Sequence, residues 1–149
     1  MSTNDSAIRH FRGRYSFLSN FAPSPITLDG IEYPTAEHAF QAHKTLDGRE
    51  RGRIAGLKDP ASAKKAGRGV ALRADWEEVK VDVMRKVLLQ KFAPGSLLAS
   101  NLMGTGEVEL IEGTDTWNDR FWGVAKGVGE NHLGRLLMEI RRDLRQSNV

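Results

Sequence analysis

The chain has 149 residues, 40% of them hydrophobic and 28% charged, which excludes a disordered chain and is typical of one folded domain. The formal charge is only +3, from 22 Lys and Arg residues against 19 Asp and Glu residues, so the composition suits a phosphorylated ligand without indicating nucleic acid. Cysteine is absent, which excludes disulfides and thiolate metal sites.

Residues 1–8 are expected to be a flexible leader, and residues 9–146 to form a single compact α+β domain, mostly helical with a small antiparallel β-sheet. The leader is polar and lacks the apolar core of a secretory signal. No apolar run approaches the roughly 20 residues needed to cross a bilayer. We therefore expect a cytoplasmic protein with no membrane partner.

A hairpin and a helix are predicted early in the chain. Apolar and polar residues alternate over 26–33 around the pair Asp29-Gly30, which favours two strands joined by a tight turn. Pro34 is expected to end the second strand. Thr35 can then cap a helix.

Three polar residues of this helix are predicted to form a candidate site. Glu37, Gln41 and Lys44 share one stripe at helical spacing, beside an apolar stripe that contains Phe40. A carboxylate, an amide and an amine in line can donate protons, accept them and hold a polar ligand. Spacing alone leaves open the alternative of a solvated helix face with Glu37 and Lys44 exposed.

Further helices are predicted over about 49–57, 60–67, 75–92 and 96–103. Gly67 is expected to be the C-cap of the second of these, and Trp76 is expected in the core. Arg68, on the tight turn that follows Gly67, could grip a phosphate with its planar guanidinium group. It belongs to a loose cationic group with Lys64, Lys65 and Arg73.

The last third of the chain is predicted to contain a strand, a long loop and a helix. Residues 108–112 alternate like a half-buried strand, and residues 113–129 are rich in glycine and polar residues. Asn131 is expected to cap the final helix, which carries a regular stripe of leucine and isoleucine residues.

The predicted loop is unusually aromatic. Trp117, Phe121 and Trp122 stand there among carboxylates such as Asp119, so the loop could stack on a planar base while its polar groups hold a sugar. The alternative is that the rings fill the core. We favour the core for Phe121, while both interpretations stay open for Trp122.

Common cofactor and metal motifs are absent from the sequence. Lys44 is not preceded by the glycines of a phosphate-binding loop, and Gly127 and Gly129 lack the third glycine of a dinucleotide fingerprint. His38 and His43 are five residues apart, whereas zinc-binding helices use a step of four. We therefore expect neither a metal nor a cofactor.

Four short sequence motifs, in this order along the chain, resemble those of the NADAR family, which is named for NAD and ADP-ribose. They are FLSNF at 17–21, PTAEH at 34–38, FWG at 121–123 and GENHLGRLLM at 129–138. The resemblance runs from about Phe11 to Leu144. It implies a NADAR-like fold and an enzyme that cleaves the bond between a base nitrogen and C1 of ribose.

The resemblance also implies functional residues. Glu37, Lys44 and Asp119 match the family's catalytic positions. Together with the patterns above, the candidate substrate-binding residues are Asn20, Phe21, Gln41, Arg68, Trp122, Gly123 and Asn131. The associated substrates are small phosphoribosylamino-pyrimidine intermediates of riboflavin synthesis, or ADP-ribose attached to guanine in nucleic acid. Asn20 has an ordinary alternative role, since asparagine often ends a turn by bonding its own backbone.

Two mechanisms are consistent with these residues. The resemblance suggests that the Lys44 amine attacks C1 and holds the sugar as a Schiff base, which requires a neutral amine. Burial and nearby cations would lower the lysine pKa, whereas an ionised Glu37 would raise it. Alternatively, Glu37 or Asp119 activates water, and Lys44 only binds anionic oxygen.

Two other kinds of protein are alternatives to a metal-independent N-glycosidase. One is a non-catalytic module that binds NAD or ADP-ribose, which would need no acid, amine and second carboxylate. The other is a structural nucleic-acid protein, which the modest charge and scattered basic residues disfavour.

Overall fold

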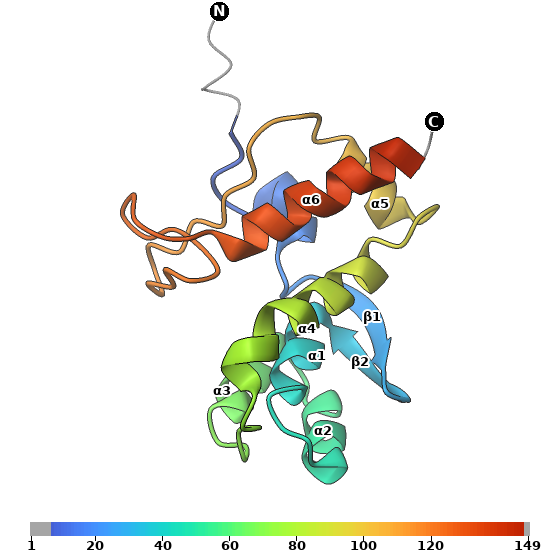
Figure 1. The fold of residues 1–149 in the computed structure, drawn as a ribbon, viewed down its shortest axis with the longest axis vertical. Helices are drawn as coiled ribbons and strands as arrows, with labels where there is room; N and C mark the ends of the chain where they lie inside the picture. Colours follow the sequence, from blue (N-terminus) through green and yellow to red (C-terminus); the bar gives the residue numbers. More distant parts are fainter. Residues whose placement is uncertain (1–6, 148–149) are drawn as a thin grey trace, which may run out of the picture. The chain divides into compact units, whose positions relative to one another are not determined.

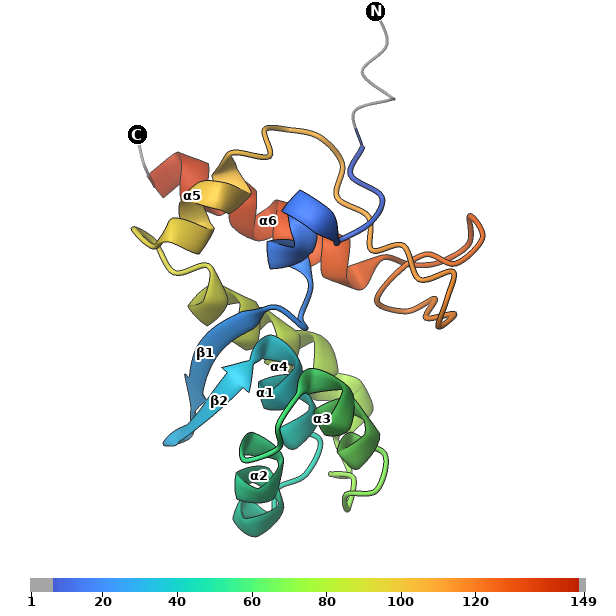
Figure 2. The ribbon, with the colours of Figure 1, turned by 180° about the vertical axis from the view of Figure 1, so that it is seen from behind.

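A computed structural model describes residues 7–147 (Figures 1 and 2). The chain forms two compact units. The central unit is Asn20–Lys91, and the terminal unit comprises the residues up to Ser19 and those from Phe92 onward. Six α-helices, a 3₁₀ helix and a two-stranded antiparallel sheet occur in the described residues, which confirms the mostly helical α+β class. None of these helices is long and apolar enough to cross a membrane.

The central unit begins with the predicted hairpin. Strands β1 (Pro23–Leu28) and β2 (Ile31–Thr35) pair antiparallel, with Leu28 opposite Ile31. Asp29 and Gly30 both have positive φ angles, of 49° and 81°, as a tight hairpin turn requires. Pro34 lies within β2 rather than ending it. A two-stranded sheet has only edge strands, where a proline is tolerated.

Helix α1 (Ala36–Ala42) lies at the centre of this unit. The Thr35 side chain accepts a hydrogen bond from the backbone N–H of His38, so the predicted cap is confirmed. All seven residues of α1 are buried, and its alanines let the hairpin and three other helices approach closely (Figures 1 and 2). The core of the unit is built from Ile26, Tyr33, Ala36, Ala39, Ala42, Ile54, Ala63 and Val87.

The three helices around α1 are α2 (Gly48–Ala55), α3 (Pro60–Gly67) and α4 (Trp76–Lys91). Asp47 and Asp59 cap α2 and α3 through side-chain oxygens. Trp76 is buried against Phe40, with ring centroids 5.1 Å apart, which confirms its place in the core. The C-cap of α3 is Arg68, so the cap predicted at Gly67 is wrong by one residue.

The terminal unit contains η2 (Gly13–Leu18), α5 (Leu97–Met103) and α6 (His132–Ser147). Helices α5 and α6 pack together, and the predicted apolar stripe of α6 is buried. Most of the predicted leader, residues 1–6, lies outside the described residues. Ile8, expected at its end, is buried, and its backbone pairs with Leu110.

The strand predicted over 108–112 is wrong, although Leu110 is fully buried. Its backbone groups are satisfied by isolated partners instead of a neighbouring strand. The carbonyl of Val108 accepts a hydrogen bond from the Arg141 side chain, and Ile8 forms a single parallel bridge to Leu110. Alternation of apolar residues cannot distinguish these partners from a sheet.

One glycine of α6 allows a close approach that a methyl group would prevent. A Cβ atom at Gly134 would lie 2.1 Å from the carbonyl oxygen of Leu110 and 2.4 Å from the Asn131 side chain. We expect Gly134→Ala to lower the free energy of unfolding by about 2 kcal/mol or more, because a backbone carbonyl cannot move aside easily. Urea denaturation measures this change.

Gly52→Ala is the matched control. Gly52 also lies in a helix, and no atom lies within 4 Å of a Cβ placed there. That substitution should stabilise the protein by up to about 1 kcal/mol through helix propensity. Equal stabilities for the two variants would contradict the packing described for α6.

Candidate active site

Glu37 and Gln41 form a buried pair on α1. The Gln41 amide Nε2 donates a hydrogen bond to Glu37 Oε2 at 2.7 Å, one helical turn away. The backbone N–H of Glu37 donates to the carbonyl of Asn20 at 3.0 Å, which ties the start of α1 to the preceding segment. Glu37 is only 8% exposed, so a solvated face is wrong for this carboxylate.

Gly67 makes room for this pair. A Cβ atom at Gly67 would lie only 1.9 Å from Gln41 Oε1, so a side chain at this position would force the Gln41 amide to move. Gln41 Oε1 is buried and has no hydrogen-bond partner among the described residues. An acceptor in this position is suited to a substrate N–H or O–H group.

Lys44 lies beyond the end of the helix. α1 ends at Ala42, His43 is its C-cap, and the Lys44 N–H donates to the carbonyl of Gln41 at 3.2 Å in a tight turn. The predicted helical stripe is therefore wrong in its last member. Past the cap, backbone N–H groups bond to the free carbonyl groups of the last turn, and the chain leaves the helix path. Residue spacing in the sequence does not reveal where this happens.

The electrostatics of Lys44 are those expected of an activated amine. Lys44 is half-buried, and burial is the largest cause of its lowered pKa. Glu37 opposes this effect and raises the Lys44 pKa, while Arg68, Lys64 and Lys80 lower it further. The structure thus brings Lys44 into the field of Glu37 and of three cations from α4 and the end of α3.

Asn20, Phe21 and Arg68 belong to the same unit. Asn20 is 7% exposed, its Nδ2 contacts Met84 Sδ at 3.5 Å, and its Oδ1 has no partner among the described residues. Phe21 is 41% exposed and Arg68 is exposed. Their contact with a substrate stays a prediction.

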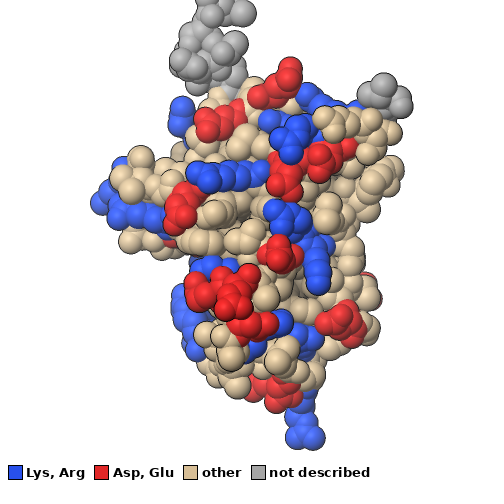
Figure 3. All heavy atoms as spheres, in the orientation of Figure 1, with Lys and Arg blue, Asp and Glu red and all other residues tan. Residues whose placement is uncertain are grey.

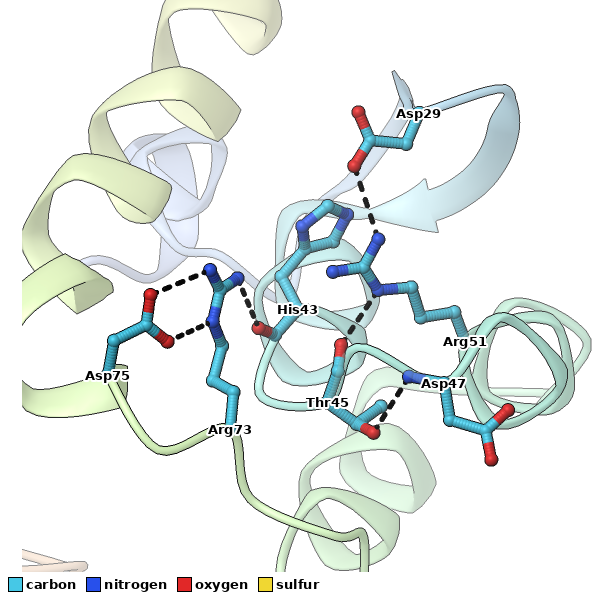
Figure 4. Close-up of polar contacts among 7 residues, drawn as sticks. All are labelled: Asp29, His43, Thr45, Asp47, Arg51, Arg73 and Asp75. Atoms are coloured by element: carbon cyan, nitrogen blue, oxygen red, sulfur yellow. Dashed lines mark hydrogen bonds and ion pairs between the residues drawn. The ribbon is translucent and has the colours of Figure 1, made fainter.

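The two histidines of this region, His38 and His43, contact groups of the protein's own core and backbone. His38 Nε2 lies 3.0 Å from the carbonyl of Leu57, which can only accept, so Nδ1 accepts from the Thr35 hydroxyl at 2.8 Å. His43 packs edge-on against Tyr33, at 6.1 Å between ring centroids, and close to Arg51 (Figure 4). Burial first, and then Arg51, lowers the His43 pKa from 6.5 to about 4.

In the terminal unit, Asp119 shapes the aromatic loop. Its Oδ1 accepts hydrogen bonds from the N–H groups of Phe121 at 3.0 Å and Trp122 at 2.8 Å. Phe121 and Trp122 are half-buried and meet edge-on, at 4.8 Å between ring centroids, and Phe121 stacks on His132 at 4.2 Å. Base stacking by Trp122 stays a prediction, as does a catalytic role for Asp119.

Asn131 fastens the loop instead of capping α6. Its Oδ1 accepts from the N–H of Glu112 at 3.0 Å, and its Nδ2 donates to the carbonyl of Leu110 at 2.9 Å. Its backbone is left-handed, with φ of 55°, a conformation that asparagine tolerates. The predicted cap is therefore wrong, because distant backbone groups occupy the side chain.

The loop itself caps α6. The N–H groups of His132 and Leu133 donate to the carbonyls of Phe121 at 3.1 Å and Trp122 at 3.0 Å, and Asn131 N–H reaches the carbonyl of Gly123 at 3.3 Å. Gly123 is buried, and a Cβ atom there would lie 2.4 Å from the carbonyl oxygen of Glu112. Both features set the path of the loop; their part in binding a substrate stays a prediction.

One cation of the site, Lys80, was missed from sequence, and Lys64 was seen only as part of a loose cationic group. Lys80 carries no local signal, and its ammonium is bonded to Glu77 at 2.7 Å. Lys64 and Arg68 are four residues apart, a spacing that could have paired them on one face of α3. Among the described residues, no group of three His, Asp or Glu side chains could hold a metal. Metal independence stays a prediction.

Known proteins resemble this chain over most of its length. Residues 8–145 match the family described as the NADAR domain. N-glycosidase YbiA of Escherichia coli strain K12 is 44% identical over 133 residues, which cover 87% of this chain and 82% of that protein. Riboflavin biosynthesis protein VVA0006 of Vibrio vulnificus is 38% identical and covers 89% of this chain, which spans 36% of that longer protein.

A solved structure agrees with this match. The NMR structure of E. coli YbiA has a TM-score of 0.82 and 41% identity to this chain, covering 95% of it and 85% of the YbiA chain. The chain therefore belongs to the NADAR family.

His43 predicts a pH dependence of stability. The unfolded state takes up the His43 proton near pH 6.5 and the folded state only near pH 4. The stability linked to neutral His43 is therefore complete above about pH 6.5 and is lost as the pH falls towards 4. The expected loss is about 3 kcal/mol.

Denaturation curves at several pH values test this prediction. His43→Gln should show a flatter dependence between pH 4 and 6.5, whatever its stability at neutral pH. His10→Gln, at an exposed histidine, should keep the wild-type slope. Identical slopes for all three proteins would show that His43 is not the group responsible.

Proposed function

We propose that this protein is an N-glycosidase that hydrolyses the bond between a base nitrogen and C1 of a ribosyl group. The observation that supports this function best is the half-buried Lys44 amine, whose pKa is lowered while a buried carboxyl, Glu37, lies within its field. The names of YbiA and of the riboflavin biosynthesis relative point the same way.

In the first step, opening of the ribose ring leaves an imine-like carbon at C1, still joined to the base nitrogen. The Lys44 Nζ lone pair forms a new bond to C1, one Nζ proton passes to the base nitrogen, and the base departs with the electrons of the C1–N bond. Glu37, in its protonated form, gives the departing nitrogen its second proton. The product is a Schiff base between Lys44 and the sugar.

In the second step, water replaces Lys44. Glu37, now ionised, accepts a proton from the water as its oxygen attacks C1, and the Schiff base collapses to the free amine and the free sugar. The sum is one N-glycoside and one water giving a base and a ribose. Gln41 donates to Glu37 and so holds the carboxyl in a single orientation.

Asp119 is a weaker candidate for the proton carrier. Its Oδ1 accepts two backbone hydrogen bonds that shape its own loop. We therefore assign the acid and base roles to Glu37. Activation of water by Glu37, with Lys44 as an electrostatic clamp, is the competing mechanism.

We propose a small phosphoribosyl substrate of the kind found in riboflavin synthesis. The cations around Lys44 suit a phosphate. On the face drawn in Figure 3, Lys and Arg side chains are interspersed with Asp and Glu, which does not favour a long nucleic-acid strand. Two alternatives, cleavage of ADP-ribosylated guanine and binding of ADP-ribose without cleavage, are distinguished by the experiment below.

The cytoplasmic location stays a prediction.

The test is incubation with a phosphoribosylamino-pyrimidine and, separately, with an ADP-ribosylated guanine oligonucleotide. Mass spectrometry then detects free base and free sugar phosphate. We expect release from the first substrate, and we expect Glu37→Gln to slow it by about 100-fold or more, because an amide cannot transfer the proton.

Glu32→Gln is the control, since Glu32 is an exposed carboxylate of the same unit and should leave release unchanged. Release only from the oligonucleotide would transfer the function to de-ADP-ribosylation. Release from neither, with ADP-ribose still bound, would favour the binding module.

A further inference from the structure

Three consecutive carbonyl groups follow the end of α1, at His43, Lys44 and Thr45. Carbonyls at a helix end have no partner within the helix and take one from a side chain, water, a tighter turn or a ligand. Here each accepts a hydrogen bond from an arginine that lies elsewhere in the central unit, and Figure 4 draws those to His43 and Thr45. The backbone of Lys44 is therefore fixed on both sides of its Cα atom.

Arg73 holds the first two carbonyls. Its backbone N–H donates to the carbonyl of Lys44 at 2.8 Å, and its Nη1 lies 3.5 Å from the carbonyl oxygen of His43. The guanidinium group is itself held by Asp75 through two parallel bonds, of 2.6 and 3.1 Å. A fork held at two points can keep its remaining N–H aimed at one carbonyl.

Arg51 holds the third carbonyl. Its Nε donates to the carbonyl of Thr45 at 2.8 Å, and its Nη1 pairs with Asp29 of the hairpin turn at 3.2 Å. The Thr45 hydroxyl accepts from the N–H of Asp47, which caps the helix that carries Arg51. Thr45 is thus bonded both to Arg51 and to Asp47, at the two ends of the first turn of the same helix (Figure 4).

We propose that Arg51 and Arg73 are positioning residues for Lys44, which fix its backbone so that its amine reaches C1 of the substrate. This inference rests on the proposed function of Lys44. A lysine side chain is long and flexible, so the place of its Cα atom and of the first side-chain bonds decides where Nζ can go. Misplacing a reacting group by about 1 Å can slow a reaction by about 100-fold.

Stability alone is a poor explanation for these contacts. Asp29 and Asp75 have side chains 70% and 44% exposed, and ion pairs in such places contribute little to folding. What Arg51 and Arg73 share is the segment that their N–H groups reach, residues 43–45. A structural role would lower the melting temperature, whereas a positioning role lowers the turnover of the folded enzyme.

The test compares Arg51→Gln, Arg73→Gln and Asp75→Asn with Arg53→Gln. Arg53 lies on the same helix as Arg51 and makes an exposed ion pair with Glu50 at 2.9 Å. Asp75→Asn keeps Arg73 but loosens its fork, so it stays informative if an arginine variant folds poorly. For each variant, the folded fraction, the melting temperature, kcat and KM are measured with the full chain.

We expect kcat per folded molecule to fall about tenfold or more in both arginine variants and less in Asp75→Asn, with KM within about twofold. Arg53→Gln should match the wild type. Unchanged kcat in the folded arginine variants, or a change in KM or melting temperature alone, would overturn the positioning role.

A parallel assay of Lys44→Arg separates this inference from the proposed function. If Lys44→Arg is inactive while the arginine variants turn over normally, only the positioning role fails. If Lys44→Arg keeps near-normal turnover, Lys44 is not the nucleophile, and the covalent mechanism and the positioning role both fail while the N-glycosidase function stands.

Discussion

The central constraint in this protein is the half-buried amine of Lys44, which lies in the field of one carboxyl and three cations. Burial and the cations disfavour the ammonium form, while Glu37 favours it, so the charge of Lys44 depends on a balance among neighbours. That balance requires α1, the end of α3 and α4 to meet around one turn. Gly67 permits the approach, since any larger residue would strike the Gln41 amide that holds Glu37.

Short-range patterns in the sequence predicted much of the fold. The cap at Thr35 and the Asp29-Gly30 turn depend on groups within four residues of one another, so their signals are local. The fold class and most helix positions follow from such signals and from apolar periodicity. Glu37 and Gln41 were predicted to share one helix face for the same reason, since one helical turn separates them.

The errors have a common physical cause, which is competition from partners far away in the sequence. Asn131 bonds to backbone groups of Leu110 and Glu112, some 20 residues upstream, and so does not cap its own helix. Residues 108–112 find a distant arginine side chain instead of a neighbouring strand. Lys44 lies beyond the end of α1, and the charge of Lys80 acts on Lys44 although no local pattern in the sequence indicates this.

The account depends most on Lys44 acting as a nucleophile, and borohydride trapping tests this directly. Borohydride reduces a Schiff base to a stable secondary amine, so the protein would gain the mass of the sugar phosphate less one oxygen atom. Peptide mapping after turnover should find the adduct on Lys44, none on the exposed Lys58 and none in Lys44→Arg. Turnover without any adduct on Lys44, or near-normal turnover by Lys44→Arg, would contradict the covalent mechanism and favour water activated by Glu37.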